Sequence, residues 1–547
     1  MQGLMQDWPL LCHRIIDHAA LNHGGREIVT RSVEGPLQTT TYAAIRSSAL
    51  KVAKRLARDG IRIGDRVATL AWNTSRHLEA WYGIPGVGAI YHTVNPRLYP
   101  EQIAWIINHA EDRVLLTDLT FVPLLEKLPL PSIERFVVLT DAAHMPSTSL
   151  RNAVPYAQWI GEVDDDFAWA KLDENAAAGL CYTSGTTGHP KGVVYSHRSN
   201  VLQAMAVAWR DVFAITCRDV VMAVVPMFHA NGWSIALTAP MVGASLVMPG
   251  AKIDGASLFE LLTKYRVTCT AAVPTIWLGL LNYLEESGGK LEHLRRVVIG
   301  GAACPRSIVK AFQENYGVEV RHAWGMTEMS PLGTVCSLKP EYAALDGDAR
   351  LDILAKQGHA PFTIEMKITD DAGGALPRDG KTSGRLKVRG PAVARAYFKE
   401  SGEMLDSDGF FDTGDVATID RNGYMQITDR AKDVIKSGGE WISSIELENL
   451  AVGHPKVAEA AVIGVRHPKW DERPLLVVVV KPGQQASKAE ILDFMRDKAA
   501  SWWVPDDVVF VPEIPHSATG KILKAALREQ FRDHVLPTAR QPPGSLR

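Results

Sequence analysis

Hydrophobic and polar positions along the first 430 residues follow two alternating periodicities. Tyr42–Asp59 repeats its apolar residues at helical spacing, and Arg66–Ala71 follows as a short apolar stretch typical of a buried strand. The same alternation recurs in Glu101–Ala110 and Val114–Thr117. Strands that alternate with helices favour parallel sheets covered on both faces. We therefore predict an α/β fold with two parallel-type sheets in this region.

The pattern changes twice towards the C-terminus. Turn-forming Gly and Asp residues become frequent at 371–380 and 407–415, which predicts short hairpins in a small β-rich subdomain at about 350–430. Helical and strand-like stretches then alternate again from about residue 433. We therefore predict an N-terminal domain over residues 1–430 and a compact α+β domain over 433–547.

Composition narrows the class of protein. A chain of 547 residues is too long to fold around one ordinary hydrophobic core. Its content of 46% apolar and 22% charged residues is typical of a globular protein. With 59 basic and 61 acidic residues the net charge is −2, which gives no overall attraction to nucleic acid. Apolar runs such as Leu475–Val480 stop at strand length, so we expect no membrane span.

The cysteines indicate a reducing compartment. They show neither C-x-x-C pairs nor zinc spacing, and we interpret all six as buried small apolar residues. The N-terminus carries no charged region followed by an apolar stretch and a cleavage site, so we expect a cytoplasmic protein. The six cysteines are Cys12, Cys181, Cys217, Cys269, Cys304 and Cys336.

The segment Tyr182–Val193, Y-T-S-G-T-T-G-H-P-K-G-V, carries the clearest chemistry. Its glycines let backbone N–H groups turn towards a ligand, its hydroxyls donate hydrogen bonds, and Lys191 neutralises charge, so it suits a polyphosphate. The spacing differs from a Walker A loop. Its predicted phosphate-binding residues are Thr183, Ser184, Gly185, Thr186, Thr187, Gly188 and Lys191.

Four further motifs carry candidate ligand-binding residues. In His322–Glu328, H-A-W-G-M-T-E, Trp324 could cover a flat base, while Thr327 and Glu328 could hold a phosphate and its metal. Asp415 in T-G-D could accept two ribose hydroxyls, and Lys521 precedes a predicted helix on a loop. The fourth motif pairs Gly438 and Gly439 with Trp441. Taken alone, Glu328, Asp415 and Lys521 are more often a solvated charge or a turn residue, whereas the whole His322–Glu328 segment is more typical of a ligand-facing loop than of packing.

Together these motifs resemble the adenylate-forming superfamily, in order and in spacing, over nearly the whole chain. That superfamily includes acyl- and aryl-CoA synthetases, luciferases and peptide-synthetase adenylation domains. The segments M-F-H-A-N-G-W and G-G-E-W-I-S-S-I-E-L-E are most similar to bacterial medium-chain fatty acid and 3-methylmercaptopropionate CoA ligases. The resemblance implies that a carboxylate attacks ATP to give an acyl-adenylate, from which the CoA thiol displaces AMP.

The resemblance also implies a role for individual residues. Lys521 would stabilise charge during adenylation with support from Lys436, and Glu328 with Thr183 would hold Mg²⁺. Lys432, within 429–432, would be the hinge of a mobile C-terminal domain. Three further sets of residues would contact the ligands. The nucleotide would contact Gly301, Ala302, His322, Ala323, Trp324, Gly325, Met326, Asp415 and Arg430. The CoA channel would be bordered by Gly438, Gly439 and Trp441, and the acyl pocket would be formed by His229, Trp233, Val273, Pro274, Ile276 and Trp277.

Several alternatives stay open at this point. The acid could be a short- to medium-chain aliphatic acid, 3-methylmercaptopropionate or a cinnamate-type aryl acid. The sequence does not distinguish them, because the depth of the acyl pocket depends on side-chain packing. A non-catalytic nucleotide-binding protein would be expected to lose the lysines or Glu328, and none is missing. We expect a stand-alone enzyme without a following carrier domain. The oligomeric state is open, with a homodimer among the possibilities.

Overall fold

The computed structural model describes residues 1–547 except 2, 184–188, 439, 497, 517–521 and 541–547. One of the two large N-terminal sheets has seven strands, which are parallel except for the antiparallel edge strand β9. In spatial order they are β7 (Val154–Pro155), β6 (Arg135–Val138), β5 (Val114–Thr117), β3 (Arg66–Leu70), β4 (Ile90–Thr93), β8 (Ala177–Tyr182) and β9 (Gly192–Ser196).

The other large sheet has eight strands. It is parallel from β14 to β1, and an antiparallel strand closes each edge. In spatial order they are β15 (Leu332–Val335), β14 (Glu319–Gly325), β13 (Arg296–Ile299), β12 (Cys269–Ala272), β10 (Val220–Met222), β11 (Ser245–Met248), β1 (Glu27–Arg31) and β2 (Leu37–Thr41).

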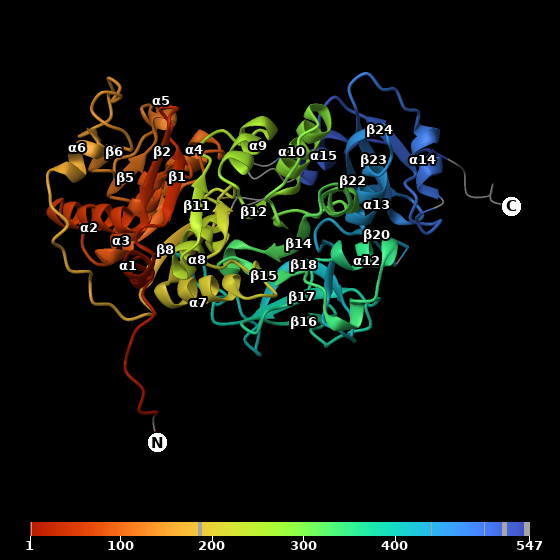
Figure 1. Ribbon diagram of the computed structural model, residues 1–547. Helices are drawn as coiled ribbons and strands as arrows, with labels where there is room; N and C mark the ends of the chain where they lie inside the picture. Colours follow the sequence, from red (N-terminus) through yellow and green to blue (C-terminus); the bar gives the residue numbers. More distant parts are fainter. Residues whose placement is uncertain (2, 184–188, 439, 497, 517–521, 541–547) are drawn as a thin grey trace.

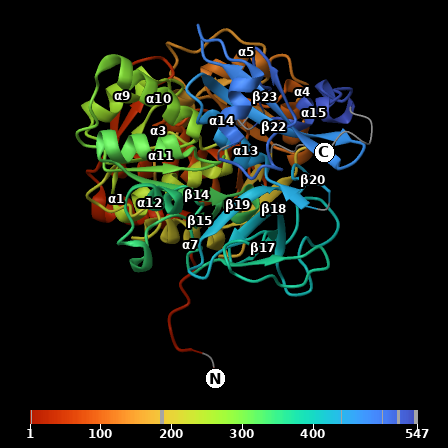
Figure 2. The same ribbon diagram turned by 90° about the vertical axis from the view of Figure 1, so that its right-hand side faces the viewer.

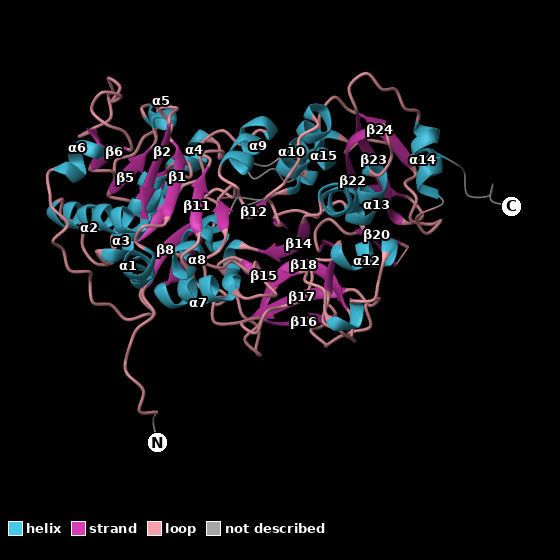
Figure 3. Cartoon of the chain, viewed as in Figure 1, coloured by secondary structure: helices cyan, strands magenta, loops and turns pink. Residues whose placement is uncertain are grey.

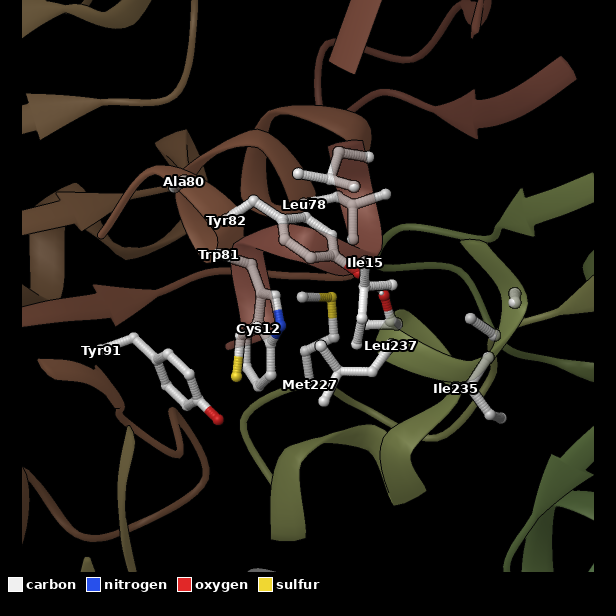
Figure 4. Packing of buried hydrophobic residues seen from close by; sticks show 14 of the residues in the cluster. Cys12, Ile15, Leu78, Ala80, Trp81, Tyr82, Tyr91, Met227, Ile235 and Leu237 are labelled. Atoms are coloured by element: carbon white, nitrogen blue, oxygen red, sulfur yellow. Dashed lines mark hydrogen bonds between the residues drawn. The ribbon is translucent and has the colours of Figure 1, made fainter. Parts of the chain in front are cut away.

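Helices cover these sheets and contribute to a shared core (Figure 1). Tyr82 donates a 2.8 Å hydrogen bond to the carbonyl of Ala236, and the Trp81 ring stacks on Tyr91 at 4.0 Å (Figure 4). The helices are α1 (Cys12–His23), α2 (Tyr42–Arg58), α3 (Ser75–Gly86), α4 (Pro100–Ala110), α5 (Val122–Leu125), α6 (Tyr156–Gly161), α7 (His197–Ala208), α8 (Ile235–Val242), α9 (Gly255–Lys264), α10 (Pro274–Ser287), α11 (Arg306–Lys310) and α12 (Gly347–Leu354).

Local sequence sets where two of the long helices begin. Thr41 caps α2 by accepting a hydrogen bond from the N–H of Ala44, and Thr74 caps α3 by accepting one from His77. Such caps satisfy N–H groups that a helix leaves without partners in its first turn.

The β-rich subdomain is a four-stranded antiparallel sheet next to the end of β14 (Figure 3). Its apolar face packs on Trp324 and Met329, so its core touches the segment that carries the candidate nucleotide residues. The strands are β16 (Glu365–Thr369), β17 (Gly384–Arg389), β18 (Phe411–Ile419) and β19 (Met425–Arg430).

The C-terminal region forms its own sheet and core, seen in blue in Figure 2. Ser444, the first residue of α13, donates 2.6 Å hydrogen bonds from its N–H and hydroxyl to Asp429, which ties this region to the end of β19. Its elements are β20 (Ile435–Ser437), β21 (Glu440–Ile442), α13 (Ser444–Val452), β22 (Val457–His467), β23 (Asp471–Val480), α14 (Lys488–Arg496), β24 (Asp507–Phe510) and α15 (Lys524–Gln530).

The predicted fold class is confirmed, with two parallel-type sheets, a β-rich subdomain and a smaller α+β part. The prediction that all six cysteines are buried is wrong for Cys217, which is exposed. It lies in the turn that Asp219 closes by accepting hydrogen bonds from Thr216, on the way into β10. Within the described residues, no helix combines the length and apolarity needed to cross a membrane.

Candidate active site

A cavity of about 530 Å³ lies between the second sheet, the β-rich subdomain and the end of β8. Segments from distant parts of the chain meet there, because β14 ends beside the hairpin of β18 and β19. The lining residues are Thr183, Phe213, His229, Ala230, Trp233, Gly300, Gly301, Ala323, Trp324, Gly325, Met326, Thr327, Glu328, Pro331, Leu332, Arg385, Tyr397, Phe411, Asp412, Thr413, Gly414 and Arg430.

Trp324 gives the cavity one flat wall. Its side chain is 9% exposed and packs so closely on Gly333 of β15 that any side chain there would collide with the indole. The indole Nε1 donates a 3.0 Å hydrogen bond to Asp415, and the other carboxylate oxygen of Asp415 pairs with Arg430 Nε at 3.0 Å. Asp415 itself is not among the lining residues, whereas its two partners, Trp324 and Arg430, are.

Glu328 is held by a residue that the sequence did not single out. The hydroxyl of Tyr397 donates a 2.7 Å hydrogen bond to Oε1 of Glu328, which is 6% exposed. Burial, followed by the charge of Glu328, raises the pKa of Tyr397, so its hydroxyl stays protonated and can donate. The same tyrosine ring lies 4.6 Å from Lys191 Nζ, which also pairs with Glu400 at 3.3 Å.

The structure describes the two ends of the predicted phosphate loop. Thr183 lines the cavity, and its N–H donates a 2.8 Å hydrogen bond to the carbonyl of Lys191. The two ends are therefore joined at the cavity that Glu328 also lines. The predicted residues Ser184, Gly185, Thr186, Thr187 and Gly188 lie outside the described residues.

A left-handed turn carries Trp233 into the lining of the cavity. Positive φ angles run through five residues from Ala230 to Ser234, with 52° at Trp233. Trp233 is 8% exposed, and a Cβ at Gly300 would lie 3.1 Å from its indole Cη2. Buried Asn231 supports the turn through a 3.2 Å hydrogen bond to the hydroxyl of Tyr91. His229 lines the cavity beside this turn.

The prediction that Trp277 lines the acyl pocket is wrong. It is 0% exposed and packs in the core, where its Nε1 donates to the carbonyl of Val298. Because α10 begins at Pro274, helical periodicity turns Trp277 towards the sheet. Val273, Pro274 and Ile276 are likewise absent from the described lining, although a Cβ at Gly301 would lie 3.1 Å from Val273.

Two predicted nucleotide neighbours also lie elsewhere. His322 is buried, and its Nδ1 is 2.8 Å from the carbonyl oxygen of Ala355. Side chains alternate along β14, and the next residue, Ala323, is the one that lines the cavity. Ala302 is exposed outside the lining. Gly325 and Met326 do line the cavity, as does Gly301.

The C-terminal region contributes none of the described lining residues. Lys436 is exposed on β20, and Gly438, at φ 61°, donates its N–H to the carbonyl of Trp470 at 2.8 Å. Burial lowers the pKa of Lys432, which follows β19. The predicted residues Gly439 and Lys521 lie outside the described residues, as does the side chain of Trp441.

The lining also includes side chains that sequence reasoning missed. Arg385 Nε donates a 2.9 Å hydrogen bond to Asp412, and Phe411 lies beside this pair on β18. Phe213 adds apolar surface. No motif marks these residues, because their strands meet the cavity only through tertiary pairing.

The site fits a magnesium ion held together with phosphates. Within the described residues, no three His, Cys, Asp or Glu side chains cluster as a complete metal cage. Mg²⁺ bound with nucleotide typically takes only one or two carboxylates and completes its shell with phosphate oxygens and water. Glu328 and the hydroxyl of Thr183, which line the same cavity, are oxygen donors of this kind.

Comparison with known proteins identifies the family of this chain. The AMP-binding enzyme family matches residues 16–398, and its C-terminal domain matches 446–521. The chain is 51% identical to 3-methylmercaptopropionyl-CoA ligase of Ruegeria pomeroyi, covering 97% of this chain and 99% of that protein. It is 46% identical to medium-chain-fatty-acid–CoA ligase of Ectopseudomonas oleovorans, covering 98% of each.

A solved structure extends the likeness to the fold. An anthranilate CoA ligase in complex with anthranoyl-AMP superposes with a TM-score of 0.84 at 26% identity, covering 96% of this chain and 99% of that one. The predicted resemblance to the adenylate-forming superfamily is thereby confirmed. The chain belongs to the AMP-binding enzyme family, and it is an ATP-dependent, AMP-forming ligase.

Proposed function

We propose that this acyl-CoA synthetase activates a short- to medium-chain monocarboxylic acid and transfers it to CoA. One observation supports the proposal: a single cavity is lined by Trp324 and Arg430, the proposed nucleotide residues, and also by the apolar side chains of Trp233 and Phe213. Glu328 and Thr183 also line it. A carboxylate that enters past Trp233 would therefore meet ATP within one enclosed space.

The first half-reaction joins the acid to AMP. A carboxylate oxygen attacks the α-phosphorus of ATP, a P–O bond forms, and the bond to the bridging oxygen breaks so that pyrophosphate leaves. Thr183 and Lys191 would bind the β and γ phosphates, and Asp415 would accept the ribose hydroxyls. Lys521 would stabilise the charge that grows at the α-phosphate, with Lys436 supporting it.

Glu328 with Thr183 would hold Mg²⁺, which offsets phosphate charge when bound. Tyr397 orients this carboxylate, because its hydroxyl donates to Oε1 of Glu328. Glu400 pairs with Lys191 in the structure, and the phosphates of ATP would compete for that lysine.

The second half-reaction transfers the acyl group. The CoA thiol loses its proton and attacks the acyl carbon, a C–S bond forms, and the C–O bond to AMP breaks. We propose that the C-terminal domain, residues 433–547, turns about Lys432 within the hinge 429–432 for this step. Gly438 and Gly439 would then border the pantetheine channel with Trp441, where a side chain would obstruct the thiol arm.

The apolar side chains of the lining favour an uncharged acyl chain. Among the described lining residues, the two cations are Arg385 and Arg430, and each already has a carboxylate partner. A second carboxylate on the substrate would therefore meet no arginine or lysine without a carboxylate partner among these residues. The relatives named above act on 3-methylmercaptopropionate and medium-chain fatty acids, which share this apolar character.

Two narrower candidates follow from particular relatives. A 3-methylmercaptopropionate ligase is favoured by the 51% identity over nearly the whole chain. A cinnamate-type aryl acid is favoured by the fold match to an anthranilate ligase.

A substrate screen tests the proposal. The enzyme is assayed with ATP, Mg²⁺, CoA and a panel of C2 to C16 fatty acids, 3-methylmercaptopropionate and cinnamate. We expect AMP and pyrophosphate as products, with highest kcat/KM for an aliphatic acid of short or medium length. ADP as product, or binding of ATP without turnover on any acid, would contradict the proposal.

The half-reactions separate the roles of the C-terminal residues. Lys521→Ala should reduce acyl-adenylate formation by about 10²–10³, while thioester formation from synthetic acyl-adenylate and CoA stays near the parent rate. Gly439→Leu should show the opposite pattern, and exposed Lys481→Ala serves as the surface control. Proportional loss of both steps in both variants, with folding intact, would exclude domain alternation.

We also propose a cytoplasmic enzyme that forms a homodimer. The absence of a spanning helix among the described residues is compatible with this location. Light scattering after size-exclusion chromatography tests the dimer, and a monomer at micromolar concentration would contradict it.

A further inference from the structure

One face of α4 carries two aromatic side chains one turn apart. Trp105 and His109 are spaced i and i+4, which places them on the same side of the helix. Their rings stack with centroids 4.5 Å apart and planes inclined by 12°. The Trp105 indole also stacks on His189, at 4.4 Å and 7°. Trp105 thus stacks on two imidazole rings, one from its own helix and one from the segment that leads to Lys191.

Through these contacts α4 packs against the chain at both ends of the phosphate loop. Tyr182, the last residue of β8, directly precedes the loop, and its hydroxyl lies 2.7 Å from Nδ1 of His109. The Tyr182 ring also meets Trp105 edge-on, at 6.1 Å and 87°. His189 stands two residues before Lys191 at the other end. The same helix face therefore contacts the residue before Thr183 and the residue that leads to Lys191.

His109 is suited to this contact as a neutral ring. Burial, followed by the charge of Lys399, lowers its pKa, so Nδ1 can accept a hydrogen bond from the hydroxyl of Tyr182 at neutral pH. Lys399 donates to the carbonyl of His109 at 2.9 Å, and Phe398 meets the His109 ring edge-on at 5.7 Å. The segment that follows Tyr397 is thus fixed to the same helix.

We propose that Trp105 and His109 are positioning residues for ATP: they hold the two ends of the phosphate loop so that Thr183 and Lys191 face the phosphates. The proposal rests on the function of that loop proposed above. Neither α4 residue lines the cavity, so their effect reaches ATP through Tyr182 and His189. Thr183 and Lys191 that are already held in place cost ATP less to bind than the same residues held loosely.

The proposal predicts a selective kinetic defect. An offset-stacked aromatic pair contributes roughly 0.5–1.5 kcal/mol beyond the area it buries, which corresponds to about 2- to 10-fold in an equilibrium constant. Trp105→Ala should therefore raise the KM for ATP by about 10-fold. The KM for the acid should stay within about 2-fold, and thioester formation from synthetic acyl-adenylate should be unchanged, because that step needs no β or γ phosphate.

A series of variants tests this. Trp105→Phe keeps a flat ring that can stack on the imidazoles and should restore most of the affinity for ATP, whereas Trp105→Leu should not. His189→Ala, on an exposed side chain, should raise the KM for ATP with less risk to folding. Trp209→Ala removes a tryptophan that is 39% exposed after α7, and serves as the matched control.

Proteolysis gives a readout without turnover. Trypsin can cleave after Lys191, and release of the His189 side should speed this cleavage in Trp105→Ala, with ATP protecting the parent more strongly than the variant. Unchanged KM for ATP in both Trp105→Ala and His189→Ala would overturn the inference. The inference would also be overturned if both variants lost both half-reactions in proportion to a lowered Tm. If the parent itself releases no pyrophosphate, the proposed function fails instead.

Discussion

Trp324 Nε1 and Asp415 Oδ2 are joined by a 3.0 Å hydrogen bond across 91 residues of sequence. The bond ties the flat wall of the cavity to the carboxylate proposed to bind ribose, and Arg430 holds the other oxygen of that carboxylate. A base on the indole and a ribose on the carboxylate would therefore be positioned as one unit.

Trp324→Phe should separate these two contributions. The variant keeps a flat ring over Gly333 but removes the N–H that orients Asp415. A hydrogen bond to a charged group contributes about 1.5–3 kcal/mol, so we expect the KM for ATP to rise roughly 10-fold or more. Pyrophosphate release at varied ATP measures this. An unchanged KM for ATP, with an altered KM for the acid instead, would place the nucleotide elsewhere.

Tyr397→Phe should weaken the response to magnesium. Without the hydroxyl, Oε1 of Glu328 loses its 2.7 Å donor and the carboxylate is no longer oriented. We expect the Mg²⁺ concentration for half-maximal adenylation to rise by about 10-fold at saturating ATP and acid. Tyr265→Phe, at the end of α9 and away from the cavity, is the control. The same half-saturation in both variants would show that Glu328 does not hold the ion.

Trp233→Ala should change which acid is preferred. The indole lies against Gly300 and Gly301, and its removal would open space in the cavity. We expect kcat/KM to shift towards longer chains while the KM for ATP changes by less than about 2-fold. Competition between pairs of acids in one reaction measures the shift directly. An unchanged order of preference would exclude Trp233 from the acyl site.

A buried carboxyl predicts how stability depends on pH. Glu79 of α3 accepts a 2.6 Å hydrogen bond from Tyr156, and burial raises the pKa of Glu79 from 4.5 to about 7. The folded state therefore favours the protonated form. This contribution to stability is complete below about pH 4.5 and is lost as the pH rises through 7.

Glu79→Gln should remove that pH dependence. The amide imitates the protonated carboxyl and can still accept from Tyr156. At pH 8 we expect the variant to be more stable than the parent by roughly 3 kcal/mol, and at pH 4.5 we expect almost no difference. Thermal unfolding at both pH values measures this, with exposed Glu286→Gln as the control. Equal destabilisation at both values would mean that Glu79 is ionised in the fold.

Sequence predicted the parts of the site that lie within continuous motifs. Trp324 and Glu328 share one strand end, and Thr413 to Asp415 share one hairpin, so spacing along the chain already places them together. Two errors came from the direction of side chains. Trp277 and His322 lie next to cavity segments, but the helical and strand periodicities turn their side chains into the core.

Other residues could not be found without the fold. Tyr397 contacts Glu328 across 69 residues, and Trp105 meets His189 only because α4 lies beside the end of β8. Neither belongs to a motif that marks a ligand. Their positions follow from the order of strands in the first sheet and from the attachment of the β-rich subdomain, which a linear pattern does not contain.

The left-handed turn from Ala230 to Ser234 constrains how substrate choice can be altered. For residues other than glycine this conformation costs roughly 1–2 kcal/mol each, and Gly232 is the single glycine of the five. Packing of Trp233 and the hydrogen bonds of Asn231 must offset that cost. A library that varies only Trp233 would therefore also remove one of the contacts that offset this cost. If Trp233 sets chain length as proposed, redesign should vary Ala230, Gly232, Trp233 and Ser234 together and retain Asn231.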